Sequence, residues 1–221
     1  NLIDFYKKKK IKKFIHIGSS LEYGKTKSPH KEKTMTKKVT PLKSIYAKSK
    51  LLSTNYCINA FKKKSFPVTV LRPYLVYGPG QKINRLIPFI ISKSLTNKKF
   101  PCSSGVQLRN FLFVEDFVKA IFKTLTKKSV NGEIINIGSN ENLRVKKVIL
   151  MIKNYLNSGK PMFGKIKLRK DESTKYYPSI KKAKNLISWE PFIKFEKGLI
   201  QTIKYYKEKG DKKNIKKNKF F

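Results

Sequence analysis

The sequence predicts an α/β fold in which helices cover both faces of a mostly parallel sheet. Short apolar stretches rich in β-branched residues alternate with longer stretches whose apolar residues recur at helical spacing, which is the pattern of a doubly wound sheet. Three of the short stretches end at Ser19, Arg72 and Gly138. These residues are therefore expected at the carboxyl edge of the sheet, where ligands bind in such folds. The length of 221 residues is enough for one large core and an added smaller unit.

The elements expected along the chain follow from these two periodicities. Strands, which are short, apolar and bounded by Gly, Pro or Asn, are expected at 12–18, 67–71, 110–114 and 132–138. Helices are expected at 2–10 (the end of one), 44–61, 85–95, 115–125, 145–156, 179–187 and 195–207. The polar stretch 25–43, with Pro29 and Pro41, is expected to be a loop that could fold over a site, and 77–81 a turn. The last ten residues, 212–221, are expected to be a poorly ordered basic tail.

The charge is extreme, with 52 basic and 13 acidic residues and a net charge of +39. Nucleic-acid binding is one class of function that such a charge suggests. However, only five of the basic residues are arginine, the residue that contacts bases and phosphates in bidentate fashion, and the lysines are spread over the whole chain. We therefore expect salt-sensitive attraction to polyanions rather than specific nucleic-acid recognition.

Cysteine content and hydropathy bear on the compartment. The two cysteines, Cys57 and Cys102, are too few for a disulfide framework and lack neighbouring metal ligands. No metal site is expected, and both thiols are expected to be reduced, as in the cytoplasm. No apolar run approaches the length of about 18 residues that spans a bilayer, and no signal peptide is visible.

The candidate catalytic residues are Ser19, at a strand end, and Tyr46 with Lys50, which lie one helical turn apart. The spacing Tyr-x-x-x-Lys is a weak signal by itself, since lysine is abundant and the pattern occurs five times. Only the pair at 46 and 50 follows a strand-end serine and opens a helix. A phenol is a poor base at neutral pH, but an ammonium four residues on stabilises the phenolate, and a serine hydroxyl can share the moving proton. This set predicts proton and hydride transfer at a carbinol carbon, with a nicotinamide carrying the hydride.

The sequence resembles the extended short-chain dehydrogenase/reductase family, the NAD-dependent epimerases and dehydratases of nucleotide sugars. The matching stretches begin with Ile-Gly-Ser-Ser-Leu-Glu-Tyr-Gly at 17–24, Ser-Ile-Tyr-Ala-Lys-Ser-Lys at 44–50 and Leu-Arg-Pro-Tyr-Leu-Val-Tyr-Gly-Pro-Gly-Gln at 71–81. They continue at 107–116, 136–139 and 183–191. The ordered set is more specific than any single motif.

The resemblance implies roles for particular residues. It implies that Ser19, Tyr46 and Lys50 are catalytic. It also implies a set of residues that contact the cofactor, NAD or NADP: Gly18, Ser19, Tyr46, Lys50, Arg72, Pro73 and Tyr74. Its expected substrate contacts are Ser20, Asn84, Arg85 and Arg109, with Arg109 gripping a diphosphate. The alternatives are surface ion pairs for the last two arginines and a helix cap for Ser19. We expect His16 to be a satisfied core histidine and Trp189 to be core packing.

The sequence also departs from the pattern of this family in several places. The glycine-rich phosphate loop of the first strand-helix unit is absent, which predicts an N-terminally truncated chain and an incomplete Rossmann-type sheet with a smaller C-terminal substrate-binding subdomain. The expected division is 1–140 for the dinucleotide-binding part, with an insertion at about 79–108, then 141–208 mainly for substrate, and a tail at 209–221. Where dehydratases of the family carry Thr-Asp-Glu, this chain has Ser19-Ser20-Leu21, so a 4,6-dehydratase is disfavoured. Leu75 stands where many members of the family have a substrate-contacting Asn, and Asn110 stands where Asp is usual in Arg-Asp-Phe, so the resemblance leaves the substrate open.

The function implied is an NAD(P)-dependent oxidoreductase or epimerase acting at C4 of a nucleotide-activated sugar, of the 4-keto-6-deoxysugar reductase or 4-epimerase type. Such sugars feed surface polysaccharides. The alternatives are a truncated remnant that keeps the fold without activity and, less favoured, a basic nucleic-acid-binding protein. The family also suggests a cytoplasmic homodimer that pairs through the helix containing Tyr46.

Overall fold

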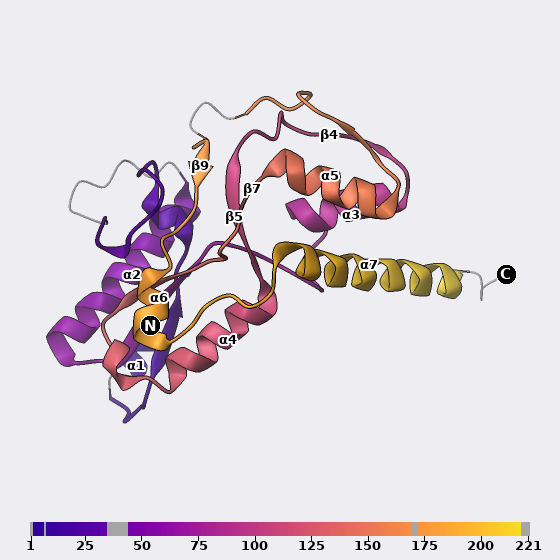
Figure 1. Ribbon diagram of the computed structural model, residues 1–221. Coiled ribbons are helices and arrows are strands. Elements are labelled where there is room, and N and C mark those ends of the chain that lie inside the picture. Colours follow the sequence, from indigo (N-terminus) through magenta and orange to yellow (C-terminus); the bar gives the residue numbers. More distant parts are fainter. Residues whose placement is uncertain (1, 7, 35–43, 169–171, 218–221) are drawn as a thin grey trace.

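The computed structural model describes residues 2–6, 8–34, 44–168 and 172–217. They form two lobes, one around a three-stranded parallel sheet and one around a helical cluster (Figure 1). None of the described helices is long and apolar enough to cross a membrane.

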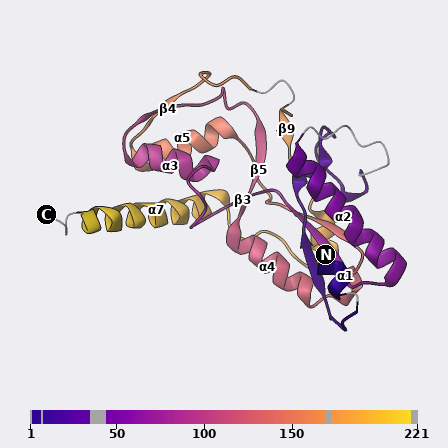
Figure 2. The ribbon, with the colours of Figure 1, turned by 180° about the vertical axis from the view of Figure 1, so that it is seen from behind.

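The first lobe is built on the strands β1 (Phe14–Ile17), β2 (Val68–Pro73) and β6 (Ile134–Ile137), which pair in parallel in that order. The helices α1 (Leu2–Tyr6) and α2 (Ile45–Lys64) lie on one face, and α4 (Val114–Leu125) and α6 (Lys181–Ile187) lie on the other (Figures 1 and 2). Side chains alternate between the two faces of the sheet and so contribute to two separate cores. Val68 and Val70 pack toward α2, while Leu71 and Ile135 pack toward α4 and α6. The doubly wound arrangement expected from the sequence is therefore confirmed.

The second lobe packs α3 (Leu86–Leu95), α5 (Val145–Leu156) and α7 (Phe195–Lys217) around their own apolar core. Its short strands β4 (Lys99–Pro101) and β8 (Lys160–Met162) pair in parallel. Between the lobes runs a second sheet of β3 (Leu75–Tyr77), β5 (Leu108–Phe113), β7 (Asn142–Arg144) and β9 (Lys175–Tyr176). The chain crosses between the lobes more than once, since α6 returns from the stretch 141–208 to pack near β6.

Most expected elements are present, with shifted ends. The helix expected at 145–156 has those bounds in the structure, and the strand expected at 110–114 begins earlier, at Leu108. Five strands of two or three residues, β3, β4, β7, β8 and β9, were not expected. They are too short to show an alternating pattern, and two of them contain a proline, which ordinarily argues against a strand.

Two expectations about irregular segments are wrong in part. The stretch 212–221 was expected to be a poorly ordered tail, but α7 continues through residue 217, because lysine is a good helix former and Gly210 does not stop the helix. Residues 218–221 lie outside the described part. In the loop expected at 25–43, residues 35–43 also lie outside it, but 25–34 is held in place rather than free to fold over a site. His30 is fully buried there and forms a parallel bridge with Pro178.

Candidate active site

Ser19 stands at the point where β1 ends and a 3-10 helix, η1 (Ser20–Tyr23), begins. Its hydroxyl oxygen accepts the N–H of Leu21 at 3.2 Å, and its own N–H donates to Glu22 Oε1 at 2.7 Å. The two bonds form a capping box that fixes both the backbone and the side chain of the serine. Ser19 is thus a cap, as the alternative interpretation held, and it also lines a cleft.

Tyr46 and Lys50 lie on the first turns of α2, which Ser44 caps by accepting the N–H of Ala47 at 3.4 Å. Lys50 turns inward, and its Nζ donates to the carbonyl of Ile17 at 2.8 Å. The same ammonium lies 5.9 Å from the centroid of the Tyr46 ring. Tyr46 is 53% exposed, so its phenol is open to a ligand. The start of α2 is therefore tied to the carboxyl end of β1 by the lysine.

Ser19, Tyr46 and Lys50 line one cleft of about 780 Å³ at this edge of the sheet. Of the other residues expected at the site, Gly18, Ser20, Pro73, Tyr74, Arg85 and Arg109 also line it. Arg72 and Asn84 are not part of its wall. A cleft of this size is in the range that holds a small-molecule ligand.

Arg72 lies beneath the cleft rather than in its wall. Its side chain is fully buried, its Nε donates to Glu22 Oε2 at 2.8 Å, and its Nη2 is 2.7 Å from the same oxygen. The guanidinium also stacks over the ring of Tyr23, at 4.9 Å from its centroid. A buried carboxylate supplies the partner that a buried arginine needs. Direct contact of Arg72 with a cofactor, as expected from the sequence, does not follow from this geometry.

Tyr74 is held against the floor of the cleft by His30, whose Nδ1 is 2.7 Å from the tyrosine hydroxyl. His30 Nε2 lies 3.1 Å from the carbonyl oxygen of Thr26, an acceptor, which assigns the ring proton to Nε2 and leaves Nδ1 to accept from Tyr74. Burial lowers the pKa of His30 and raises that of Tyr74, so both groups are neutral. Sequence reasoning missed His30 because it placed this residue in a loop.

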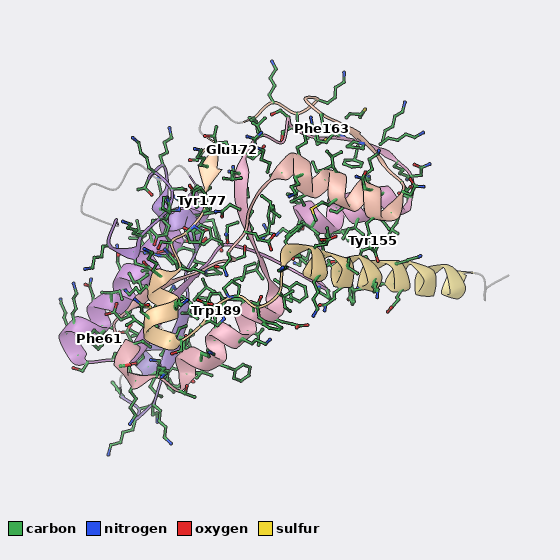
Figure 3. The ribbon with its side chains drawn as sticks, in the orientation of Figure 1. Phe61, Tyr155, Phe163, Glu172, Tyr177 and Trp189 are labelled. Atoms are coloured by element: carbon green, nitrogen blue, oxygen red, sulfur yellow. The ribbon has the colours of Figure 1, made fainter. Side chains whose placement is uncertain are left out.

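Arg109 faces the cleft from β5 and is paired with Glu172, whose Oε1 lies 2.7 Å from Nη2. Glu172 lies near β9, on the segment that passes between the lobes, with Tyr177 further along it (Figure 3). The pair is partly open to solvent, so an anionic ligand can reach the guanidinium. Arg85 is exposed on the cleft wall just before α3, and Asn84 is exposed outside it.

His16 does not have the satisfied environment that we expected. Its Nε2 is buried and has no hydrogen-bond partner among the described residues. Burial and the nearby charge of Lys50 lower the pKa of its imidazole. His16 alternates with Ile15 and Ile17 along β1, so it lies on the same face as Phe14, which packs in the apolar cluster under α2. Trp189 is buried core packing as expected, with its Nε1 donating to the carbonyl of Asp116.

Glu22 and Glu172 were not singled out from the sequence. A usable signal existed for the first, because Ser-x-x-Glu at 19–22 is the spacing of a capping box. No local pattern identifies the second, since its pairing with Arg109 joins residues 63 positions apart in the chain.

Comparison with known proteins gives a consistent set of matches. The sequence model of the NAD dependent epimerase/dehydratase family matches residues 1–138. The chain is 32% identical to dTDP-D-glucose 4,6-dehydratase from Homo sapiens over 216 residues, which cover 94% of this chain and 60% of that protein. It is 34% identical to dTDP-glucose 4,6-dehydratase from Haemophilus influenzae over 212 residues, which cover 90% of this chain and 62% of that protein. The chain thus spans about 60% of the length of these curated relatives.

Among solved structures, UDP-glucuronic acid 4-epimerase from Bacillus cereus, in complex with UDP-glucuronic acid and NAD, superposes with a TM-score of 0.84. The two chains are 28% identical, and the match covers 94% of this chain and 65% of that one.

Proposed function

Because the chain belongs to the NAD dependent epimerase/dehydratase family, we propose that it carries the catalytic site of an NAD(P)-dependent oxidoreductase or epimerase acting at C4 of a nucleotide-activated sugar. The observation that supports this most strongly is the inward position of Lys50, bonded to Ile17 at the end of β1 while Tyr46 and Ser19 line the same cleft. Strand-end hydroxyl, phenol and ammonium are thereby brought to one place, as the chemistry requires.

In this proposal the three side chains divide the proton chemistry. Tyr46 exchanges a proton with the C4 oxygen of the sugar, and the ammonium of Lys50 stabilises the phenolate form of the tyrosine. The oxygen of Ser19 already accepts the N–H of Leu21, so its own hydrogen remains to be donated to the sugar oxygen. A nicotinamide, when bound, supplies or accepts the hydride.

The cleft fits the nicotinamide end of NAD or NADP by the chemistry of its donors. Lys50 has three N–H groups and uses one on the carbonyl of Ile17, which leaves two for ribose hydroxyls. Pro73 and Tyr74 offer an apolar wall for the ring. The family is NAD-dependent, and the Bacillus cereus epimerase was solved with NAD. The lobe built on β1, β2 and β6 is therefore assigned to the cofactor and the helical lobe to the substrate.

Arg109 is the residue that we assign to the diphosphate of a nucleotide sugar, with Arg85 and Ser20 as further contacts on the cleft wall. Asn84 is not assigned, because it lies outside that wall.

The carboxylates near the cleft favour a C4 reductase or epimerase over a dehydratase, although the curated relatives above are dehydratases. Elimination of water needs an acid and a base beside the sugar. At position 21 the cleft is lined by a leucine, which can act neither as an acid nor as a base. The carboxylate of Glu22 is paired with Arg72 and accepts the N–H of Ser19. Glu172, the one carboxylate among the described residues of the cleft wall, is paired with Arg109.

A homodimer through α2 is part of the proposal. Ile45, Leu52 and Tyr56 are 84%, 69% and 37% exposed, and their spacing places them on one face of the helix. An apolar stripe of this kind suits pairing with a second copy.

The reaction, with its nucleotide sugar and nicotinamide, is assigned to the cytoplasm. The charge predicts only salt-sensitive attraction to nucleic acid, without sequence recognition.

The proposal is tested on the full-length protein expressed from its gene, with reduced nicotinamide and 4-keto-6-deoxy or hexose nucleotide sugars as substrates. We expect Tyr46→Phe to lower kcat by about 100-fold or more without changing nucleotide-sugar binding. Tyr155→Phe is the matched control, since Tyr155 is exposed on α5 in the other lobe (Figure 3). A Tyr46→Phe variant as active as this control would refute the role of Tyr46. Absence of turnover in the unaltered protein would favour the inactive remnant.

A further inference from the structure

Beneath Ser19, the turn after β1 is built around a buried carboxylate. Glu22 has no exposed side-chain surface, and its two oxygens have different partners. Oε1 accepts the N–H of Ser19 at 2.7 Å, while Oε2 accepts the Nε of Arg72 at 2.8 Å. One side chain therefore links the backbone of Ser19 to a rigid position in the middle strand of the sheet.

The space for this carboxylate is provided by Gly18. A Cβ at this position would lie 2.6 Å from Glu22 Oε1 and 3.2 Å from Val70 Cγ1. The backbone of Gly18 is not in the left-handed region, so the glycine is required here for room and not for its conformational freedom. The turn is thus shaped to admit the carboxylate under the serine.

We propose that Glu22, held by Arg72, is a positioning residue that fixes the direction in which the Ser19 hydroxyl faces the cleft. The carboxylate anchors the N–H of Ser19, and this anchor sets the backbone on which the hydroxyl is carried. The Ser19 oxygen in turn accepts from Leu21, which leaves the hydroxyl hydrogen for the cleft. The inference rests on the proposed catalytic role of Ser19, and it adds Glu22 as the residue that acts through Ser19, while Arg72 balances the charge of the buried carboxylate.

Two double variants separate this positioning role from a purely structural one. Removing either charge alone would leave its partner unpaired in the core and unfold the region. The amide variant, Glu22→Gln with Arg72→Met, removes both charges but keeps a carbonyl oxygen that can accept the N–H of Ser19. The apolar variant, Glu22→Leu with Arg72→Met, removes both charges and also the acceptor. Replacing both partners of a buried ion pair is tolerated far better than removing one.

The kinetic test compares these variants in the full-length protein. We expect the amide variant to retain kcat within about threefold of the unaltered protein, and the apolar variant to lose about 10- to 100-fold in kcat at a similar KM. We also expect Ser19→Ala to lower kcat severely in the unaltered protein but by less than about threefold in the apolar variant, because the hydroxyl is already misplaced there. Equal kcat in the two double variants, or the same effect of Ser19→Ala in both backgrounds, would overturn the inference.

A second readout does not depend on turnover. The amide hydrogen of Ser19 should exchange with solvent at least about tenfold faster in the apolar variant than in the amide variant, while core amides of β2 exchange alike in both. Equal exchange at Ser19 would show that Glu22 is not its anchor. If Tyr46→Phe is as active as the unaltered protein but the exchange difference is found, the proposed function fails and the anchor stands. If Tyr46→Phe is inactive and no exchange difference is found, only the anchor fails.

Discussion

Replacing Gly18 by alanine is expected to destabilise the protein by about 3 kcal/mol, because the new methyl group would collide with the buried carboxylate of Glu22. At 2.6 Å from Oε1 the methyl cannot be accommodated, and its other near neighbour, Val70, is itself buried and unable to retreat. Glu22 must therefore move, which breaks its bonds to Ser19 and Arg72. Overpacking alone costs about 1–3 kcal/mol, and disrupting a buried ion pair costs about 3–5 kcal/mol, so the estimate is a conservative one.

Urea unfolding followed by the fluorescence of Trp189 measures this loss, since it is the one tryptophan of the chain and is 1% exposed. In a thermal scan the same change corresponds to a decrease in Tm of roughly 6–12 °C. The decisive comparison is Gly18→Ala in a background that carries both Glu22→Ala and Arg72→Met, where the obstacle is gone, no buried charge is left unpaired, and the further cost should be below about 1 kcal/mol. A Gly18→Ala variant within about 1 kcal/mol of the unaltered protein, or an equal cost in both backgrounds, would refute the reasoning.

Three further predictions follow from the site. Arg109→Ala should weaken binding of a nucleoside diphosphate by about 10- to 100-fold in a calorimetric titration, because a charged hydrogen bond to phosphate is lost. The control Arg144→Ala, at an exposed arginine, should change this affinity little. Equal losses of affinity in the two variants would mean that only net charge matters. Lys50→Met should abolish turnover while the exposed Lys48→Met on the same helix leaves it intact, and activity retained in the former would exclude an ammonium role. The free energy of unfolding should fall as the pH drops below 6.5, because burial lowers the pKa of His30 in the folded protein and the unfolded chain binds the proton more readily. The stabilisation is present in full above pH 6.5 and is lost as the pH falls toward the lowered pKa of the folded protein. A His30→Asn variant should therefore show a flatter pH dependence of stability in urea titrations, and an unchanged slope would contradict the prediction.

The sequence was sufficient for the elements that carry a long, regular pattern. The helix at 145–156 and the start of α2 after Ser44 could be located because apolar periodicity and a capping residue act over neighbouring positions. Local patterns of the same kind predicted that Ser19 lies at a strand end and that Lys50 lies one helical turn beyond Tyr46. The inward turn of Lys50 is a tertiary fact, and it was expected only through the resemblance to a family.

What the sequence could not supply are pairings between distant positions. Arg72 lies within the buried strand β2, and its carboxylate partner lies 50 positions away in a turn that looks polar and exposed in the sequence. His30 lies in a stretch with the composition of a loop, yet it is buried because Tyr74 and the segment around Pro178 close over it. Such contacts depend on which segments the fold brings together, and neither hydrophobic periodicity nor local propensity encodes that.

The central claim is hydride transfer at C4 of a nucleotide sugar in the cleft lined by Ser19, Tyr46 and Lys50. Its most direct test is to incubate the full-length protein with a 4-keto-6-deoxy nucleotide sugar and reduced nicotinamide in which both hydrogens at C4 are replaced by deuterium, and to locate the label in the product by NMR. We predict deuterium on C4 of the sugar in the unaltered protein and none with Tyr46→Phe. Product without deuterium at C4, or labelled product from the Tyr46→Phe variant at the unaltered rate, would contradict the account.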